Sequence, residues 1–400
     1  MFPLSDAPII PSLLDTDLYK LTMMQAVFHQ HPHVNVEYEF KNRTGGVNLL
    51  SYKEKIETEI ASLCNTLRFQ SAEIEYLTHL PFMKRHFLDL LQMFQLNPQH
   101  VSVYDADGRL GINIKGGWLY TILFETPILA LISEIYARHK SENSESMSMF
   151  ELGERRLLEK IELIREVPDF KFADFGTRRR FNRQWQEHVI TTLIKEVPTN
   201  FVGTSNVAFA KQFGIKPIGT MAHEWLQAGQ GMQNIRVSQS QKVMLQSWVN
   251  EYRGKLGIAL TDVIGIDAFL IDFDDYFAKL YDGVRHDSGD PYIFGDKIIH
   301  HYERFNIDPL SKTIVFSDGL NFKTALEILE YFRGRIQVAF GIGTNLMNDF
   351  PQYKALQIVL KMTKCNGNSV AKISDTDGKT MCTDEKYLAY LKNVFAEKSV

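Results

Sequence analysis

One histidine lies in a setting that favours chemistry. The segment IGTMAHEWLQ, residues 218–227, places His223 after a short apolar run and at the start of a helical pattern. In α/β folds the end of a strand is where ligands bind and where catalytic side chains gather. His223 is therefore the first candidate catalytic residue.

A second candidate site combines a cation with two carboxylates. In RHDSGDP, residues 285–291, Asp287 and Asp290 can hold ribose hydroxyls or a magnesium ion. Arg285 can pair with an anionic group through its planar guanidinium. The alternative is a self-capping turn, in which Asp and Ser side chains bond to the nearby backbone. Both interpretations stay open.

Two glycine-containing segments favour phosphate binding. GIGTN, residues 341–345, follows an apolar run, so its backbone N–H groups and the Thr344 hydroxyl can approach a phosphate. A short Gly-x-Gly is more often only a tight turn. The preceding unit, SDGLN at 317–321, strengthens the interpretation because the last two strand exits of a barrel frequently build a phosphate site together.

A third cluster, DFGTRRRF at 174–181, offers an aromatic face and a guanidinium at one predicted strand exit. Phe175 can cover a flat ring, and Arg178 can bind a carboxylate or a phosphate. Three consecutive arginines point in different directions if a helix begins here. We therefore interpret Arg179 and Arg180 as surface charges.

The elements around these motifs indicate two different regions. Residues 1–145 mix helical stretches with an alternating run at 34–40 and a hairpin signal at Asp107-Gly108, which is typical of an α+β domain. Residues 146–362 repeat short apolar runs followed by helical patterns, with expected strands at 170–174, 200–203, 216–219, 257–261, 282–284, 313–317 and 336–340. Residues 363–400 are expected to form strands and a helix that pack back on the N-terminal domain.

The repeated units predict an irregular α/β barrel of the TIM type, because seven strands are recognisable instead of eight. In a closed parallel barrel the strand exits share one face, so residues as distant as Arg178 and Thr344 can meet there. A metal-dependent hydrolase is one function for such a face, with His223, Asp262, Asp287 and Asp318 around the ion. A non-catalytic nucleotide-binding regulator would keep only the glycine segments.

Composition excludes several classes of partner. The 400 residues carry a formal charge of −4 without blocks of like charge, so no basic excess exists for a nucleic-acid backbone. No run of eighteen apolar residues and no signal-peptide pattern is found, which predicts a cytoplasmic protein without a membrane partner. The three cysteines lack metal-binding spacing and are expected to be reduced thiols.

Eight motifs together resemble the nicotinate phosphoribosyltransferase family in its bacterial form: LLDTDLYKLTMMQAVF, DFGTRRRF, VGTSNV, GTMAHEW, VRHDSGDP, SDGLN, GIGTNL and AKISDTDGKTMC. They occur in order over nearly the whole chain. The resemblance implies a type II phosphoribosyltransferase that works as a homodimer. Such an enzyme forms nicotinate mononucleotide and pyrophosphate from nicotinate and phosphoribosyl pyrophosphate in NAD salvage. It uses magnesium and couples ATP hydrolysis through a phosphohistidine.

The resemblance also assigns roles to residues. His223 becomes the phosphohistidine, and Arg285 and Asp287 become further catalytic residues. Nicotinate is expected at Tyr19, which would reach across the dimer to stack on the ring, and at Phe175, Arg178, Thr204, Ser205, Thr220 and Arg285. The phosphoribosyl donor is expected at Asp287, Ser288, Gly289, Ser317, Asp318, Gly319, Gly341, Gly343 and Thr344. Magnesium is expected near Asp287, Asp290 or Asp318.

Substrate choice depends on one position. The related nicotinamide enzyme carries an aspartate where this sequence has Ser205. An aspartate would repel a carboxylate substrate, whereas Ser205 or Thr204 can donate a hydrogen bond to it. The sequence therefore favours nicotinate, and the nicotinamide enzyme is the nearest alternative.

Overall fold

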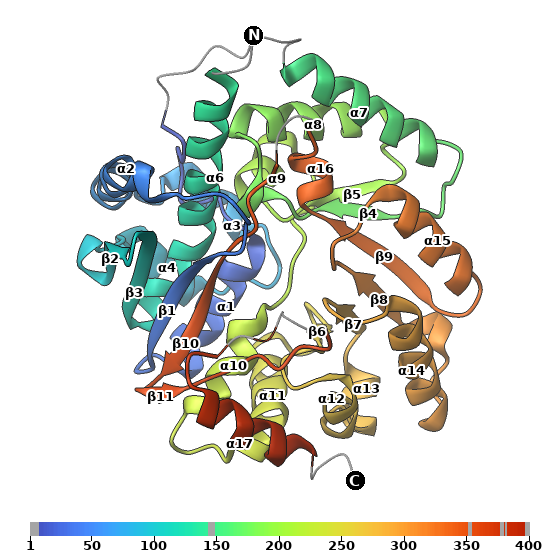
Figure 1. The fold of residues 1–400 in the computed structure, drawn as a ribbon. Helices are drawn as coiled ribbons and strands as arrows, with labels where there is room; N and C mark the ends of the chain where they lie inside the picture. The colour runs from blue at the N-terminus through green and yellow to red at the C-terminus, as the bar shows by residue number, and fades with distance from the viewer. Residues whose placement is uncertain (1–7, 143–148, 351–353, 377–379, 381, 397–400) are drawn as a thin grey trace.

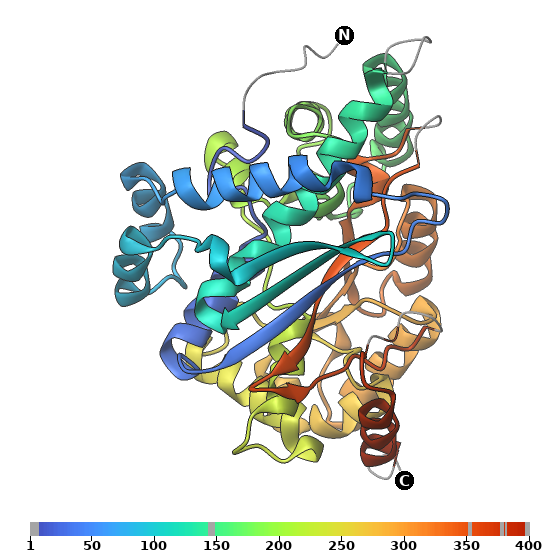
Figure 2. The same ribbon diagram turned by 60° about the vertical axis from the view of Figure 1, so that its left-hand side comes forward.

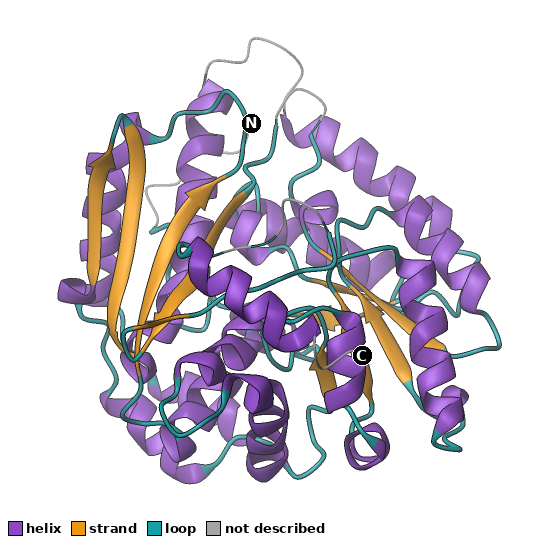
Figure 3. Cartoon of the chain, turned by 60° about the horizontal axis from the view of Figure 1, so that its bottom comes forward, coloured by secondary structure: helices purple, strands orange, loops and turns teal. Residues whose placement is uncertain are grey.

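The computed structural model describes residues 8–142, 149–350, 354–376, 380 and 382–396. Figure 1 shows two sheets side by side, with helices around the second sheet and strand β10 running back from the second region to the first. The same two sheets are seen from other sides in Figures 2 and 3. This arrangement confirms a barrel-like α/β region beside an N-terminal α+β region.

The first sheet is antiparallel and has the order β11-β10-β1-β3-β2. Its strands are β1 (Asn35–Asn42), β2 (Val101–Ala106), β3 (Arg109–Gly117), β10 (Ile358–Cys365) and β11 (Asn368–Ser369). The predicted hairpin is present, because Asp107 (φ 51°) and Gly108 (φ 79°) both adopt the left-handed backbone that a tight two-residue turn needs. β10 pairs with β1, so the domain boundary predicted between 362 and 363 is wrong, because it falls inside a strand.

The helices of the first region are α1 (Leu18–Gln30), α2 (Lys53–Thr66), α3 (Ser71–Thr78), α4 (Arg85–Met93), α5 (Trp118–Thr121) and α6 (Glu125–Glu142). Within the described residues, one helical run, Trp118–Lys140, is apolar and long enough to cross a membrane, and 94% of its most apolar window is buried inside the molecule. A core helix meets the same criteria. The burial accounts for this run without a bilayer.

The second sheet is parallel, with the order β5-β4-β9-β8-β7-β6. Its strands are β4 (Phe172–Asp174), β5 (Phe201–Thr204), β6 (Ile258–Leu260), β7 (Gly283–His286), β8 (Thr313–Phe316) and β9 (Gln337–Ile342). Helices alternate with them: α7 (Met149–Ile164), α8 (Arg183–Glu196), α9 (Val207–Phe213), α10 (His223–Gly231), α11 (Ser240–Tyr252), α12 (Ile266–Asp272), α13 (Asp275–Leu280), α14 (Pro291–Arg304), α15 (Phe322–Phe332) and α16 (Thr344–Met347). Six of the seven predicted strands are therefore confirmed.

The seventh predicted strand, 216–219, forms only a single bridge between Pro217 and Thr204. Proline has no N–H for a second ladder bond, which limits the pairing. The Thr220 hydroxyl then donates to the Ile258 carbonyl, at 2.8 Å, across the remaining gap. This segment lies between edge strands β5 and β6 and gives the barrel its irregular side.

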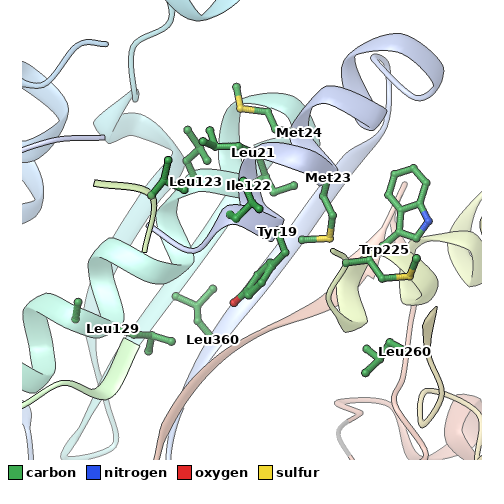
Figure 4. Packing of buried hydrophobic residues seen from close by; sticks show 14 of the residues in the cluster. Tyr19, Leu21, Met23, Met24, Ile122, Leu123, Leu129, Trp225, Leu260 and Leu360 are labelled. Atoms are coloured by element: carbon green, nitrogen blue, oxygen red, sulfur yellow. The ribbon is translucent and has the colours of Figure 1, made fainter. Parts of the chain in front are cut away.

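Helix α17 (Glu385–Ala396) confirms the predicted C-terminal helix but not its position. It packs on the short helix η5 (Val237–Gln239), and the Tyr387 hydroxyl donates to Gln230 Oε1 at 3.2 Å. The helix thus lies on the barrel region, whereas β10 and β11 belong to the first sheet. Apolar side chains of α1, α6, α10, β6 and β10 join the two regions in one core (Figure 4).

Candidate active site

A cavity of about 750 Å³ is lined by residues of both sheets. Most of the sequence-predicted site residues border it, although they come from α1, α10 and five different strand exits. These are Tyr19, Phe175, Arg178, Ser205, His223, Arg285, Asp287, Ser317, Asp318, Gly319, Gly341, Gly343 and Thr344. The parallel register brings them together, because the carboxyl ends of parallel strands lie on one face.

His223 is the first residue of α10 and is 7% exposed. Its Nε2 lies 2.9 Å from Asp262 Oδ1, 3.2 Å from Asp287 Oδ2 and 2.8 Å from Lys372 Nζ. Lys372 Nζ also contacts Asp262 Oδ2. The imidazole is therefore held between two carboxylates and one ammonium group.

Burial lowers the pKa of His223 to about 4, and the neighbouring Lys372 cation acts in the same direction, while Asp262 opposes it. The ring is consequently neutral at pH 7. An ammonium can only donate a hydrogen bond and a carboxylate can only accept one, so Nε2 serves one kind of partner at a time. When Lys372 donates, Nε2 is unprotonated and its electron pair accepts the hydrogen bond, and this tautomer is the form a nucleophile needs.

Arg285, on β7, has an incompletely satisfied guanidinium. Its Nη1 donates to the Met221 carbonyl at 3.4 Å, and its Nη2 lies 4.0 Å from Asp287. In the part of the chain that the structure describes, its buried Nε has no hydrogen-bond partner. Because an unpaired buried donor is costly, this group is suited to receive an anionic or carbonyl oxygen of a ligand.

The loop after β9 packs against Phe175. A Cβ atom on Gly341 would lie 2.3 Å from the Phe175 ring, and a Cβ on Gly343 would lie 3.1 Å from the Phe175 carbonyl oxygen. The two glycines thus allow the aromatic ring to sit directly on the strand exit. Phe175 and Thr344 border the same cavity as a result.

Tyr19, on α1, also borders the cavity, with the Arg178 guanidinium 5.5 Å from its ring centre. The Asp17 carboxylate accepts hydrogen bonds from the Tyr19 hydroxyl at 3.2 Å and from the Ser205 hydroxyl at 2.6 Å. Arg178 also pairs with Asp17 at 3.4 Å and with Glu125 at 3.2 Å. Tyr19 therefore borders the cavity of its own chain, and its predicted contribution across a dimer stays a prediction.

The Ser205 and Thr204 hydroxyls are both occupied by protein acceptors. Ser205 donates to Asp17, and Thr204, which is fully buried, donates to Asp174 Oδ2 at 2.7 Å. The Thr220 hydroxyl is likewise bonded to the backbone. In this structure, therefore, these three hydroxyls do not offer free donors to a substrate carboxylate, contrary to the expectation from sequence.

Residues 288–290 lie beside the cavity and not on it. Ser288 donates to Asp262 Oδ2 at 2.7 Å, and the Gly289 N–H donates to the Thr376 hydroxyl at 2.8 Å. Asp290 is exposed and caps α14, accepting from two N–H groups of its first turn. Asp290 Oδ1 thus serves the helix, and the expectation of magnesium near this residue stays a prediction.

Arg180 corrects the interpretation of the arginine run. Instead of a surface charge it is fully buried, and its two terminal nitrogens bond to the Asp15 carboxylate at 2.8 and 2.9 Å. Burial alone would raise the pKa of Asp15, but Arg180 holds it below its usual value. Arg179 is half-buried and borders the cavity. A short 3₁₀ turn at 177–179 aims the three side chains apart.

Several cavity residues were missed by the sequence analysis. Lys361 and Arg43 border the cavity from the first sheet and its end, and burial lowers the pKa of Lys361 to about 8. Lys372 lies within the AKISDTDGKT motif, which was its only signal. Behind the wall, buried Lys20 contacts Glu125 and Glu224, each at 2.5 Å. Lysines on strands give no local pattern that distinguishes a ligand-facing side chain from a solvent-facing one.

A metal could be held by ligand atoms of His223, Asp262 and Asp287, which all lie within 4.8 Å of one another. Over the described ranges, Asp318 is not part of this group, although it belonged to the four-residue site expected for a hydrolase. The Lys372 ammonium contacts both Asp262 and His223 and balances the negative charge of the cluster. The donor set therefore fits an ammonium-held imidazole better than a transition metal.

Comparisons with known proteins match the chain along most of its length. Residues 170–399 match the model of the nicotinate phosphoribosyltransferase (NAPRTase) family, and residues 14–133 match that family's N-terminal domain. Nicotinate phosphoribosyltransferases of Burkholderia mallei and Xanthomonas euvesicatoria are each 51% identical, over 97% of this chain and 97% and 98% of their own lengths.

Solved structures agree with the sequence relatives. The crystal structure of nicotinate phosphoribosyltransferase from Vibrio cholerae has a TM-score of 0.92 and 43% identity, covering 98% of this chain and 95% of that one. The enzyme from Porphyromonas gingivalis has a TM-score of 0.89 and 36% identity, covering 96% and 99%. The likeness therefore extends over both sheets.

Proposed function

Because the chain belongs to the nicotinate phosphoribosyltransferase family, its activity is phosphoribosyl transfer to nicotinate, and we propose that His223 couples this reaction to ATP hydrolysis as a phosphohistidine. The observation that carries the proposal is the buried, neutral imidazole between Asp262, Asp287 and Lys372. The alternative hydrolase and regulator functions are not supported by the relatives. The nicotinamide enzyme is likewise displaced, since every relative described above bears the nicotinate name.

Nicotinate attacks through its ring nitrogen and becomes a pyridinium, so the nucleophile loses no proton and needs no general base. The remaining task is to align two substrates and to stabilise the departing pyrophosphate. We infer that Phe175 holds the flat ring and that Arg285 and Arg178 bind anionic groups. The glycine segment before Thr344 and the cations Lys361 and Arg43 are available to the phosphoribosyl donor.

The proposed phosphoryl step uses the tautomer of His223 with a free pair on Nε2. This nitrogen forms a bond to the γ-phosphorus of ATP, and the bond to the bridging oxygen breaks as ADP leaves. Lys372 then shifts its hydrogen bond from Nε2 to a phosphoryl oxygen. The added negative charge lies beside Asp287 and so changes the electrostatics of the donor site.

Magnesium is proposed as the metal of the donor site. Asp287 and Asp318 both border the cavity, and Ser317 fixes Asp287 through a 2.9 Å hydrogen bond. Carboxylate oxygens of this kind suit a hard divalent cation. When bound, magnesium would neutralise pyrophosphate charge. Asp287 and Asp318 would hold it, and Ser317 would keep Asp287 oriented.

We further propose a homodimer acting in the cytoplasm, in line with the expectations from sequence. Small-molecule substrates fit a cavity of this size and charge. The test of the function is product formation: nicotinate mononucleotide and pyrophosphate are measured with nicotinate or nicotinamide, with and without ATP. Product formed from nicotinate but not from nicotinamide, in an amount that ATP increases, supports the proposal. Equal use of nicotinamide, or no effect of ATP, contradicts it.

A further inference from the structure

Gln227 is an unexplained polar group at the cavity. It lies on α10, one helical turn after His223, and is 1% exposed. Within the described part of the chain, neither its Nε2 nor its Oε1 has a hydrogen-bond partner, yet the residue borders the cavity. Other buried glutamines, such as Gln186 and Gln230, are bonded to neighbours. An orphaned buried amide of this kind destabilises the fold unless a ligand or water bonds to it.

The helical spacing places Gln227 on the same face of α10 as His223. Residues four apart on a helix share a face, with their Cβ atoms about 5–6 Å apart. A long amide side chain can therefore reach a group attached to the imidazole. Because both side chains project from helix α10, their relative placement does not depend on a loop.

The amide offers one acceptor and two donors, and this combination restricts what can satisfy it. A phosphoryl group has only acceptor oxygens, so it can bond to Nε2 but leaves Oε1 unpaired. A water molecule can donate to Oε1. A water lying next to a phosphoryl group satisfies both ends of Gln227 together.

We propose that Gln227 positions the water that discharges phosphorylated His223, an inference that rests on the proposed function. Its Oε1 accepts a hydrogen bond from the water, and its Nε2 donates to a phosphoryl oxygen. The water oxygen attacks phosphorus, and the bond between phosphorus and the ring nitrogen breaks with its electron pair returning to nitrogen. Both water protons stay with the phosphate, which leaves as dihydrogen phosphate, and His223 keeps its Nδ1 proton and returns to the neutral imidazole.

The test follows the lifetime of the label on His223. Wild type, Gln227→Met and Gln241→Met are labelled with γ-³²P-ATP, freed of nucleotide, and followed with and without nicotinate and phosphoribosyl pyrophosphate. Gln241 is the matched control, because it is equally buried and has an unpartnered Oε1 but does not border the cavity. We expect Gln227→Met to lengthen the half-life of the label at least tenfold and Gln241→Met to leave it unchanged.

The half-life does not depend on how much enzyme has folded, so partial unfolding does not obscure the result. If Gln227→Met gives no label at all, Gln227→Asn, which keeps the amide but shortens its reach, is measured in its place, with the same expected lengthening. A labelled variant that decays at the wild-type rate overturns the role of Gln227 alone. No label on wild type overturns the phosphohistidine and, with it, this inference.

Discussion

The parallel sheet and the antiparallel sheet contribute to the cavity in different ways. The parallel sheet presents His223, Arg285, Asp287 and Asp318 within a few residues of strand ends or the helices that follow. The antiparallel sheet contributes Lys361 from the middle of β10, and the chain continues from it to Lys372. His223, Asp287 and Asp318 thus come from one region, and Lys361 and Lys372, two of the cations that face them, come from the other.

This difference polarises the cavity. Lys372 contacts Asp262 and lies 4.0 Å from Asp287, and the charges of Glu125 and Asp287 oppose the loss of the Lys361 proton. A highly anionic donor with its metal would meet carboxylates through the metal and lysines directly. The two sheets must therefore keep a fixed position relative to each other. The buried ion pair of Arg180 with Asp15 connects the N-terminal segment to the barrel.

The largest expected effect is on the parallel-sheet side. Arg285→Ala removes a guanidinium with a free buried donor, and we expect kcat/KM for nicotinate to fall about 10²–10³-fold, since a charge-assisted bond to a substrate anion is lost. Steady-state kinetics with varied nicotinate measure this. Arg285→Lys keeps the charge and is expected to recover part of the loss. Unchanged kinetics in Arg285→Ala would show that Arg285 does not bind nicotinate.

A smaller effect is expected from Lys372→Met. Formation of the His223 label should fall about 10-fold to 100-fold, because the phosphoryl group loses its ammonium partner. Burial and Lys372 both lower the pKa of His223, whereas Asp262 and Asp287 raise it, so removing Lys372 raises that pKa. The acidic limb of label formation then moves to higher pH. A fall in label with an unmoved acidic limb would assign Lys372 to phosphoryl binding only.

The prediction for Lys361 concerns the alkaline side of the pH profile. Burial lowers its pKa to about 8, so it loses its positive charge as the pH rises through 8. We expect the KM for phosphoribosyl pyrophosphate to rise above pH 8 and Lys361→Met to raise it about tenfold at pH 7. Lys361→Arg keeps its charge, so the alkaline rise should disappear. Persistence of that rise in Lys361→Arg would point to another titrating group.

The smallest effect belongs to Asp290, which lies outside the cavity. Asp290→Ala removes the cap of α14 and should lower the free energy of unfolding by about 1 kcal/mol. Activity and its magnesium dependence should stay within twofold of wild type. Denaturant unfolding and a magnesium titration test both statements, with Asp287→Asn as the variant in which the magnesium dependence should change. A changed dependence in Asp290→Ala would restore this residue as a metal ligand.

Sequence reasoning predicted the parallel sheet and its exits because each βα unit carries its own local signal: an apolar run, a turn and a helical pattern. It also recovered His223, Asp287 and Thr344 for the same reason. Arg180 was misjudged because its burial depends on Asp15, far away in the chain. Lys361 and Lys372 were missed because β10 reaches the cavity through pairing with β1, which leaves no local pattern.

Phosphorylation of His223 is the decisive measurement for the proposed coupling to ATP. Purified protein is incubated with γ-labelled ATP, with and without both substrates, and wild type is compared with His223→Ala and with His188→Ala, a partly exposed histidine paired with Glu154 on the outer helices. We expect an acid-labile label on wild type and on His188→Ala, discharged as nicotinate mononucleotide appears, and no label on His223→Ala. A label that forms on His223→Ala, or a wild type that makes product without ever being labelled, would contradict the role of His223.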